Sequence, residues 1–444
     1  MRRMYFEMID YVKRWFHRTT PARFLVAGFA GVMLLGGFLL WLPISRHAGT
    51  EVSFLDSLFE AVSAVCVTGL TVVPVGQTYN FFGRLVLAIL IQIGGMGIVL
   101  LGIALILLAG GKLGFKTRSL FVQAQNLMGY TEIMKMARKI LCLMFGIEIV
   151  GAICCWPIFM QNYDPLSALG FACFHSISAF NNAGFDILGG FDSLTAYADN
   201  FWMVSVTSIL VILGGFGFIA MIDVWNRKFH WRSLLLNTKI VIVMTAGLLI
   251  GGTVLLKLTT DQTWMEAWFQ SVIARTAGFS TFPLSGFSKA GILIFIILMF
   301  IGASPNSTGG GVKTTTVFVA AVKAISSSTE HDEDSVFYRR IPDLVFSKAF
   351  VVLFFGMFVV LAGSFLVMIG NPAAEMDAVL VEVTSAFATV GSSMGLTPDL
   401  SAFSKIVIIV CMFIGRLGPV TIANLLVTGS EKAARYTEEN VLIG

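Results

Sequence analysis

Four short segments carry the residues whose chemistry stands out in this chain of 444 residues. They read FLDSLFEAVSAVCVTGLTVV (54–73), ALGFACFHSISAFNNAGFDIL (168–188), WMEAWFQSVIARTAGFSTFPL (264–284) and AVLVEVTSAFATVGSSMGLTP (378–398). Each is amphipathic, rich in small residues, and reaches a glycine: Gly69, Gly184, Gly278 and Gly391. Glycine allows the dihedrals that turn successive carbonyls toward one side, and a ring of carbonyls can replace the hydration shell of a cation. The segments therefore indicate a cation site built from backbone oxygens.

The elements that must position these segments are membrane helices. Hydrophobic residues make up 56% of the chain and charged residues 13%, with a mean hydropathy of +0.84. This composition predicts an all-α polytopic membrane protein. Apolar runs long enough to span lie at about 24–44, 82–109, 140–160, 201–222, 240–256, 290–325 (interrupted), 349–370 and 403–428, which predicts eight crossings. The six cysteines show no paired spacing, so neither a disulfide framework nor a zinc site is expected.

The distribution of charge predicts the orientation of the chain. Most of the 30 Lys and Arg residues lie in 1–23, 110–139, 223–239, 323–348 and 429–444. These stretches alternate correctly with the spans, so both termini are expected in the cytoplasm. The opposite side holds many acidic residues. One interpretation is an acidic outer vestibule that concentrates cations. The alternative is that acidic residues simply avoid the cytoplasmic side.

The four segments belong to a repeat that fills most of the chain. Each is followed by a second landmark in the next span: IGGMG (93–97), LGGFG (213–217), IGASP (301–305) and IGRLG (414–418). A helix that stops inside the membrane must return as non-helical backbone, which is tolerated only where it is buried in protein or lines water. Four tandem helix–pore-loop–helix repeats around a pseudo-fourfold central pore satisfy this condition.

The repeats predict eight segments of the chain. They are 1–23 (cytoplasmic N-terminal segment), 24–109 (repeat one), 110–139 (cytoplasmic linker), 140–225 (repeat two), 226–325 (repeat three, with a broken inner helix), 326–348 (cytoplasmic linker), 349–428 (repeat four) and 429–444 (cytoplasmic C-terminal tail).

The third landmark continues into a polar stretch, IGASPNSTGGGVKTTT (301–316), that interrupts an apolar run. We expect the inner helices of copies one, two and four to continue through their landmarks, and copy three to break inside the membrane. The break is predicted to be a gate under the carbonyl site, made of Gly302, Ala303, Ser304, Pro305, Asn306, Ser307, Thr308, Gly309, Gly310, Gly311 and Lys313. A phosphate loop is not expected, because no strand precedes the stretch and Val312 separates the glycines from Lys313.

Lys313 and Arg416 are basic residues at mid-span depth on inner helices. A charge at this depth is costly unless it faces water or a partner. They are predicted to hold the loop or to set the barrier to cations. The alternative is that each only pairs with a nearby carboxylate or carbonyl.

Further charged residues lie close to the four segments or in the spans. Arg275 is expected to point away from the cation path and to brace its segment from behind. Glu60, His175 and Glu382 occupy one aligned position, nine residues before a glycine, and are expected to donate or accept orienting hydrogen bonds. Glu148 could bind an ion, or could be a neutral or paired buried carboxylate.

VTGLT, NNAGF, RTAGF, TVGSS and NSTGGGVKT resemble the filter and loop sequences of the Trk/Ktr/HKT superfamily of potassium transporters, over essentially the whole chain. The short N-terminal segment is most similar to that of the KtrB membrane subunit. The resemblance implies that this chain binds no cofactor, that potassium is the substrate, and that sodium is possible as an activating or coupling ion. It implies potassium coordination at Val67, Thr68, Gly69, Asn182, Ala183, Gly184, Thr276, Ala277, Gly278, Thr389, Val390 and Gly391.

The resemblance also implies a homodimer in the bacterial plasma membrane, bound on its cytoplasmic face to a KtrA-like regulatory ring that binds nucleotides. Nucleic acid is not an expected partner. No catalytic motif occurs in the spans, so an enzyme is not expected. An alternating-access secondary cation symporter is the alternative function, but four short re-entrant segments favour a channel-like pore over the two large repeats typical of such transporters.

A serine in place of the first filter glycine accompanies sodium preference in this superfamily, which makes Gly69 a test of the resemblance. We expect Gly69→Ser to lower the ratio of potassium to sodium uptake, measured in vesicles with each ion supplied separately. An unchanged ratio in a folded variant would contradict the assignment of this segment.

Overall fold

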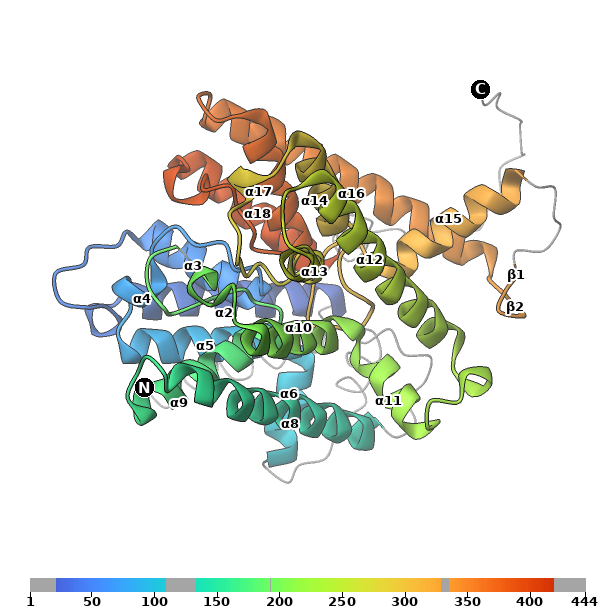
Figure 1. The fold of residues 1–444 in the computed structure, drawn as a ribbon, viewed down its shortest axis with the longest axis horizontal. Coiled ribbons are helices and arrows are strands. Elements are labelled where there is room, and N and C mark those ends of the chain that lie inside the picture. The colour runs from blue at the N-terminus through green and yellow to red at the C-terminus, as the bar shows by residue number, and fades with distance from the viewer. Residues whose placement is uncertain (1–20, 109–132, 192, 329–334, 419–444) are drawn as a thin grey trace, which may run out of the picture.

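The computed structural model describes residues 21–108, 133–191, 193–328 and 335–418 (Figure 1). The helices are α2 (Pro21–Trp41), α3 (Phe54–Cys66), α4 (Val75–Thr78), α5 (Phe81–Met96), α6 (Ile98–Leu108), α8 (Ile133–Phe159), α9 (Pro165–Phe180), α10 (Phe201–Phe216), α11 (Phe218–Asn226), α12 (Leu236–Thr259), α13 (Trp264–Ile273), α14 (Lys289–Phe300), α15 (Thr314–Ser328), α16 (Asp343–Gly370), α17 (Met376–Ala388) and α18 (Ala402–Leu417). The strands β1 (Ser335–Val336) and β2 (Arg339–Arg340) pair antiparallel. The predicted cytoplasmic segments 1–23, 110–139, 326–348 and 429–444 lie wholly or partly outside the described residues.

A long helix, a short helix, an extended segment and a further helix follow one another four times along the chain. The long helices α2, α8, α12 and α16 are long and apolar enough to cross a membrane. The short helices α3, α9, α13 and α17 have 13, 16, 10 and 13 residues, fewer than the roughly 20 that a crossing needs. The fold is therefore that of an all-α polytopic membrane protein, as predicted.

Capping residues explain where three of the short helices begin. The side chain of Ser53 accepts a hydrogen bond from the backbone of Asp56, and that of Asp164 accepts one from the backbone of Ser167. Thr263 and Glu266 form a complete capping box at the start of α13. Such caps satisfy backbone N–H groups that have no partner within the helix. These three short helices thus have a fixed start, which fixes where their other ends lie.

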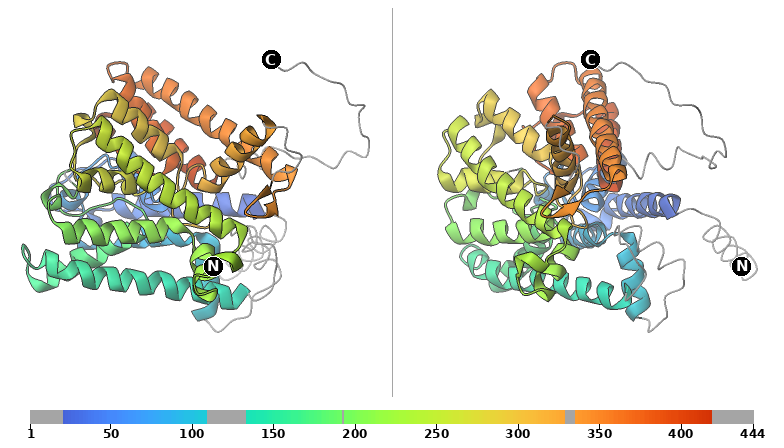
Figure 2. Two further views of the ribbon diagram at one scale, coloured as in Figure 1. Left: turned by 45° about the vertical axis from the view of Figure 1, so that its right-hand side comes forward. Right: turned by 90° about the vertical axis from the view of Figure 1, so that its right-hand side faces the viewer.

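We call each set of a long helix, a short helix and the inner helix after it a helix group: α2–α3–α5, α8–α9–α10, α12–α13–α14 and α16–α17–α18. The four helix groups contact one another in a closed cyclic order. Each long helix packs against the short helix that follows it, and α5 contacts α9, α10 contacts α13, α14 contacts α17, and α18 contacts α3. In the right-hand view of Figure 2, the blue, teal, green and orange groups lie around a common centre. The last group therefore closes onto the first, which places the ends of the four short helices near one axis.

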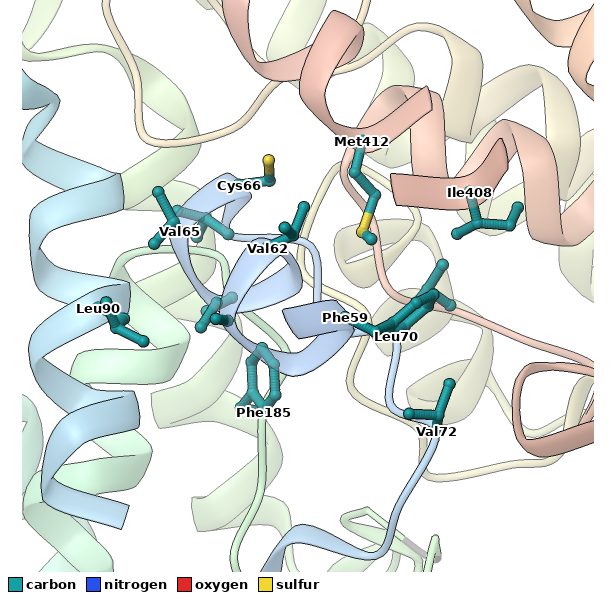
Figure 3. Close-up of a cluster of buried hydrophobic side chains, with 14 of the residues drawn as sticks. Phe59, Val62, Val65, Cys66, Leu70, Val72, Leu90, Phe185, Ile408 and Met412 are labelled. Carbon is teal, nitrogen blue, oxygen red and sulfur yellow. The ribbon is translucent and has the colours of Figure 1, made fainter. Parts of the chain in front are cut away.

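Short helix α3 is held on two sides by apolar side chains (Figure 3). Phe59, Val62, Val65 and Cys66 from α3 pack with Leu90 from α5, Ile408 and Met412 from α18, and the neighbouring residues Leu70, Val72 and Phe185. All of them are buried. This cluster joins the first and fourth groups and fixes the backbone that follows α3.

The first glycine of three landmarks is required by close packing. A Cβ on Gly94, Gly214 or Gly415 would lie less than 3.0 Å from the carbonyl oxygen of Val65, Phe180 or Phe387, respectively. Each of these carbonyls stands four residues before the filter glycine of the same copy. Any larger residue would push the inner helix away from the end of its short helix.

The last glycine of two landmarks breaks the inner helix. At Gly97 the chain bends by 101° between α5 and α6, and at Gly217 by 94° between α10 and α11. The φ angles of 74° and 93°, with ψ near 148° and 127°, cannot occur inside a helix and favour glycine. Our expectation that copies one and two continue as helix through their landmarks is therefore wrong. In copy four, α18 ends directly before Gly418, where the described residues end.

The contact at Gly214 predicts a large effect of one methyl group. We expect Gly214→Ala to destabilise the folded protein by about 1–3 kcal/mol, the usual cost of overpacking, and to lower the thermal midpoint in detergent. Gly247→Ala in α12 is the matched control, because nothing lies within 4 Å of a Cβ at Gly247. An equal effect of both changes would contradict the packing role of Gly214.

Candidate functional site

The four predicted filter glycines meet in a closed ring. A Cβ would lie less than 3.0 Å from the carbonyl oxygen of the next segment at each of them: Gly69 against Ala183, Gly184 against Ala277, Gly278 against Val390, and Gly391 against Thr68. A side chain at any of these four positions would require the neighbouring backbone to shift. The structure thus brings all twelve residues from 67–69, 182–184, 276–278 and 389–391 into one arrangement.

Each segment of the ring contains a second residue with positive φ, two positions before the glycine. The φ angles are 60° at Val67, 59° at Asn182, 80° at Thr276 and 53° at Thr389. Left-handed backbone costs a residue with a Cβ about 1–2 kcal/mol, and β-branched residues adopt it least readily. Such strain persists only where the surrounding structure fixes the backbone.

Serine hydroxyls fix the backbone in three of the four segments. Ser63 Oγ accepts a hydrogen bond of 3.0 Å from Gly69 N–H, and Ser385 Oγ accepts one of 2.9 Å from Gly391 N–H. Ser178 Oγ donates at 2.7 Å to the carbonyl of Phe185. Each of these serines begins a recurring tripeptide six residues before a filter glycine, SAV at 63–65 and SAF at 178–180 and 385–387, so the recurrence has a direct structural cause.

The aligned polar residues behind the ring hold the chain that leaves it, as expected. Glu60 Oε1 accepts from Val72 N–H at 2.8 Å, and the Glu382 carboxylate accepts from the hydroxyls of Ser393 and Thr397 at 2.6 and 2.5 Å.

The other two copies use different side chains for hydrogen bonds behind the ring. His175 Nε2 pairs with Thr207 Oγ1 at 2.9 Å. In copy three, Gln270 Nε2 donates to the carbonyl of Phe282 at 3.1 Å. The sequence comparison missed Gln270, because it stands eight residues before its glycine instead of nine.

A cavity of about 470 Å³ opens on one side of the ring. Its lining includes the four filter glycines and the residues that follow them. Asp186 is the one charged residue among the described residues of this lining. Among the described residues, the part of the predicted acidic vestibule next to the ring thus holds the carboxylate of Asp186.

A second cavity of about 250 Å³ lies beside the loop 302–313. Pro305, Asn306, Ser307, Gly309, Lys313 and Arg416 contribute to its lining, together with the helix break around Gly97. The loop also contacts ring residues, since Gly310 N–H donates to Thr389 Oγ1 at 2.8 Å. The loop therefore stands between the ring and the second cavity.

The loop forms backbone hydrogen bonds with the break between α10 and α11. Phe218 N–H donates to the carbonyl of Asn306 at 2.9 Å, and Thr308 N–H donates to the carbonyl of Gly214 at 3.2 Å. In a continuous helix, Phe218 N–H would donate to Gly214. Ser304 N–H likewise donates to Gly215 at 3.1 Å. The broken helix thus exchanges its own bonds for bonds to the loop.

Both mid-depth basic residues bind backbone carbonyls of the loop. Lys313 Nζ donates to Gly309 at 2.6 Å. The Arg416 guanidinium donates to Thr308 in the loop and to Gly94 in α5. Both side chains are thus paired with backbone carbonyls, as the alternative interpretation expects, and a role in holding the loop or in the barrier to cations stays a prediction. Arg275 is buried and lines neither of the two cavities, consistent with a side chain that points away from the ring.

Glu148 is buried between the first two helix groups. Its carboxylate accepts from Gln92 Nε2 at 3.0 and 3.1 Å and from Asn181 Nδ2 at 2.9 Å. The carboxylate is thus hydrogen-bonded to two side-chain amides, which agrees with the interpretation of a paired buried group. Gln92 and Asn181 were not singled out from the sequence, because the other three copies have no amide side chain at the corresponding positions.

The chain matches the family model of TrkH, described as a cation transport protein, over residues 32–239 and 226–435. The chain belongs to this family. Among its relatives are the Ktr system potassium uptake protein B of Bacillus subtilis, 34% identical over 98% of this chain and 99% of that protein, and the potassium/sodium uptake protein NtpJ of Enterococcus hirae, 34% identical over 97% and 99%. The Ktr protein B of Vibrio alginolyticus is 35% identical over 95% of this chain and 94% of its own length.

A solved structure has the same fold. The crystal structure of the potassium transporter TrkH from Vibrio parahaemolyticus superposes with a TM-score of 0.74 at 19% identity, covering 93% of this chain and 86% of that one. The resemblance inferred from the sequence is confirmed, and the chain is a multi-pass membrane protein of a transporter family, not an enzyme. The segment boundaries and the roles of individual ring and loop residues stay predictions.

Proposed function

We propose that this chain carries potassium into a bacterial cell through a channel-like pore on the ring axis. The closed ring of four glycine segments supports this proposal most directly, because each filter glycine approaches a backbone carbonyl of the next segment. The names of its relatives, potassium uptake protein B of Ktr systems and potassium/sodium uptake protein, support potassium as the substrate.

The pore selects cations with backbone dipoles. A potassium ion enters the cavity of about 470 Å³ past Asp186. It then exchanges its water for carbonyl oxygens of residues 67–69, 182–184, 276–278 and 389–391. The helices α3, α9, α13 and α17 end immediately before these segments. Their C-terminal ends carry partial negative charge toward the axis, which lowers the cost of holding a dehydrated cation inside the membrane.

The loop 303–313 gates this pore from the cytoplasmic side. It stands between the ring and the second cavity, which we call the inner cavity. Lys313 and Arg416 add positive charge in the path of a cation. Opening moves the loop aside and exposes its backbone groups to water in the pore. We do not propose the alternating-access alternative, because the close approaches of the ring join four segments in cyclic order rather than two halves.

The regulation and assembly that we propose follow the Ktr systems. The chain is a homodimer in the bacterial plasma membrane with both termini in the cytoplasm. A KtrA-like ring that binds nucleotides contacts its cytoplasmic face and controls the loop. Sodium acts as an activating or coupling ion.

Growth rescue tests the substrate. Expressed together with a KtrA-like subunit in a bacterium that lacks its potassium uptake systems, the chain should restore growth at low potassium. Expressed alone, it should restore growth less. A membrane-inserted chain that fails to rescue growth with its partner, while sodium or proton uptake rises, would contradict the proposal.

Removal of the gate should increase flux. We expect deletion of residues 304–311 to raise potassium flux into liposomes that contain the purified chain, because the barrier between the ring and the inner cavity is gone. Unchanged or abolished flux in a variant with wild-type elution on size exclusion would show that the loop is only a structural break.

A further inference from the structure

Three polar side chains of the ring contact the loop directly. The side-chain amide of Asn182 lies 3.2 Å from Thr308 Oγ1, and Thr389 Oγ1 accepts the hydrogen bond from Gly310 N–H. Gly309 packs against Thr276 Oγ1 so closely that a Cβ would lie less than 3.0 Å from it. Three successive loop residues thus each meet one copy of the ring.

The three contacting residues share one position in the repeat. Asn182, Thr276 and Thr389 each stand two residues before a filter glycine and have positive φ. The fourth residue at this position, Val67, has the same backbone conformation, with a φ of 60°, and no polar group. The ring backbone therefore does not require a polar side chain here.

Backbone preference does not explain the two threonines either. Threonine is β-branched like valine and adopts left-handed backbone with equal difficulty. The Val67 side chain instead lies against Gly94 of α5. The three polar residues differ from Val67 in that each contacts the loop. Thr276 Oγ1 also forms a hydrogen bond of 3.1 Å with the side-chain amide of Asn182.

We propose that Asn182, Thr276 and Thr389 form a latch that holds the loop closed against the ring. This inference rests on the proposed role of the loop as a gate. The latch residues are fully buried, so withdrawal of the loop removes the hydrogen-bond partner of Thr389 Oγ1 and the loop partner of the Asn182 side chain until water enters. Loop opening is thereby coupled to the residues that precede the filter glycines, and these side chains position the gate while the backbone carbonyls bind the ion.

Loss of one latch contact should shift the loop toward the open state. We expect Thr389→Val to raise potassium flux of the purified chain in liposomes roughly 2- to 10-fold, the range that one net hydrogen bond supplies. Thr308→Val, which removes the hydroxyl on the loop side of the contact with Asn182, should act in the same direction.

Thr384→Val is the matched control. Thr384 lies on α17, the helix that ends directly before Thr389, is buried, and its hydroxyl has no hydrogen-bond partner among the described residues. The same chemical change there removes no latch contact, so flux should equal that of the unchanged chain. Elution on size exclusion and the thermal midpoint establish that each variant is folded.

The loop deletion separates failure of the latch from failure of the gate. In the background without residues 304–311, Thr389→Val should change neither flux nor the ratio of potassium to sodium flux, because nothing is left to latch. Equal effects of Thr389→Val with and without the loop would overturn the latch, since the residue would then act on the ring alone. Raised flux in the deletion with wild-type flux in both latch variants would overturn the latch and leave the gate intact. Wild-type flux in the deletion itself would overturn the gate, and the latch with it.

Discussion

The whole structure depends on four chain reversals that bring bare backbone together inside a membrane. In hydrocarbon, an unpaired N–H or C=O group costs several kcal/mol, so each reversal needs partners supplied by the protein. Serine hydroxyls, the carboxylate of Glu60 and the amide of Gln270 supply them behind the ring. In the function that we propose, the carbonyls of the ring are then left to replace the hydration shell of a cation.

The loop obeys the same constraint on the other side of the ring. Its N–H groups need acceptors, and the break at Gly217 provides two by releasing the carbonyls of Gly214 and Gly215 from the helix. In return, Asn306 accepts the N–H of Phe218 that the break leaves without its helical partner. Loop and broken helix are therefore one hydrogen-bonded unit. The basic residues Lys313 and Arg416 complete the unit by binding loop carbonyls that no N–H group reaches.

The sequence predicted those features that a single residue type enforces, and it missed those that depend on proximity in space. A close approach of backbone to backbone strongly favours glycine, so Gly69 and its three counterparts were visible from spacing alone. The polar loop was visible because it interrupts an apolar run. In contrast, the break at Gly217 was not predictable from the sequence. A glycine in an apolar helix can equally well serve close helix packing, as Gly214 in the same landmark does. The contacts of Thr389 and Asn182 with the loop join residues 79 and 126 positions apart, and no local pattern reports them.

Ion occupancy of the ring tests the central claim most directly. Crystals of the purified protein grown in rubidium, which replaces potassium and scatters anomalously, would locate monovalent ions. The account predicts an anomalous peak on the ring axis, within coordination distance of carbonyl oxygens from residues 67–69, 182–184, 276–278 and 389–391, and its loss when sodium replaces rubidium. Rubidium bound elsewhere in the membrane region, with no peak on this axis, would contradict it.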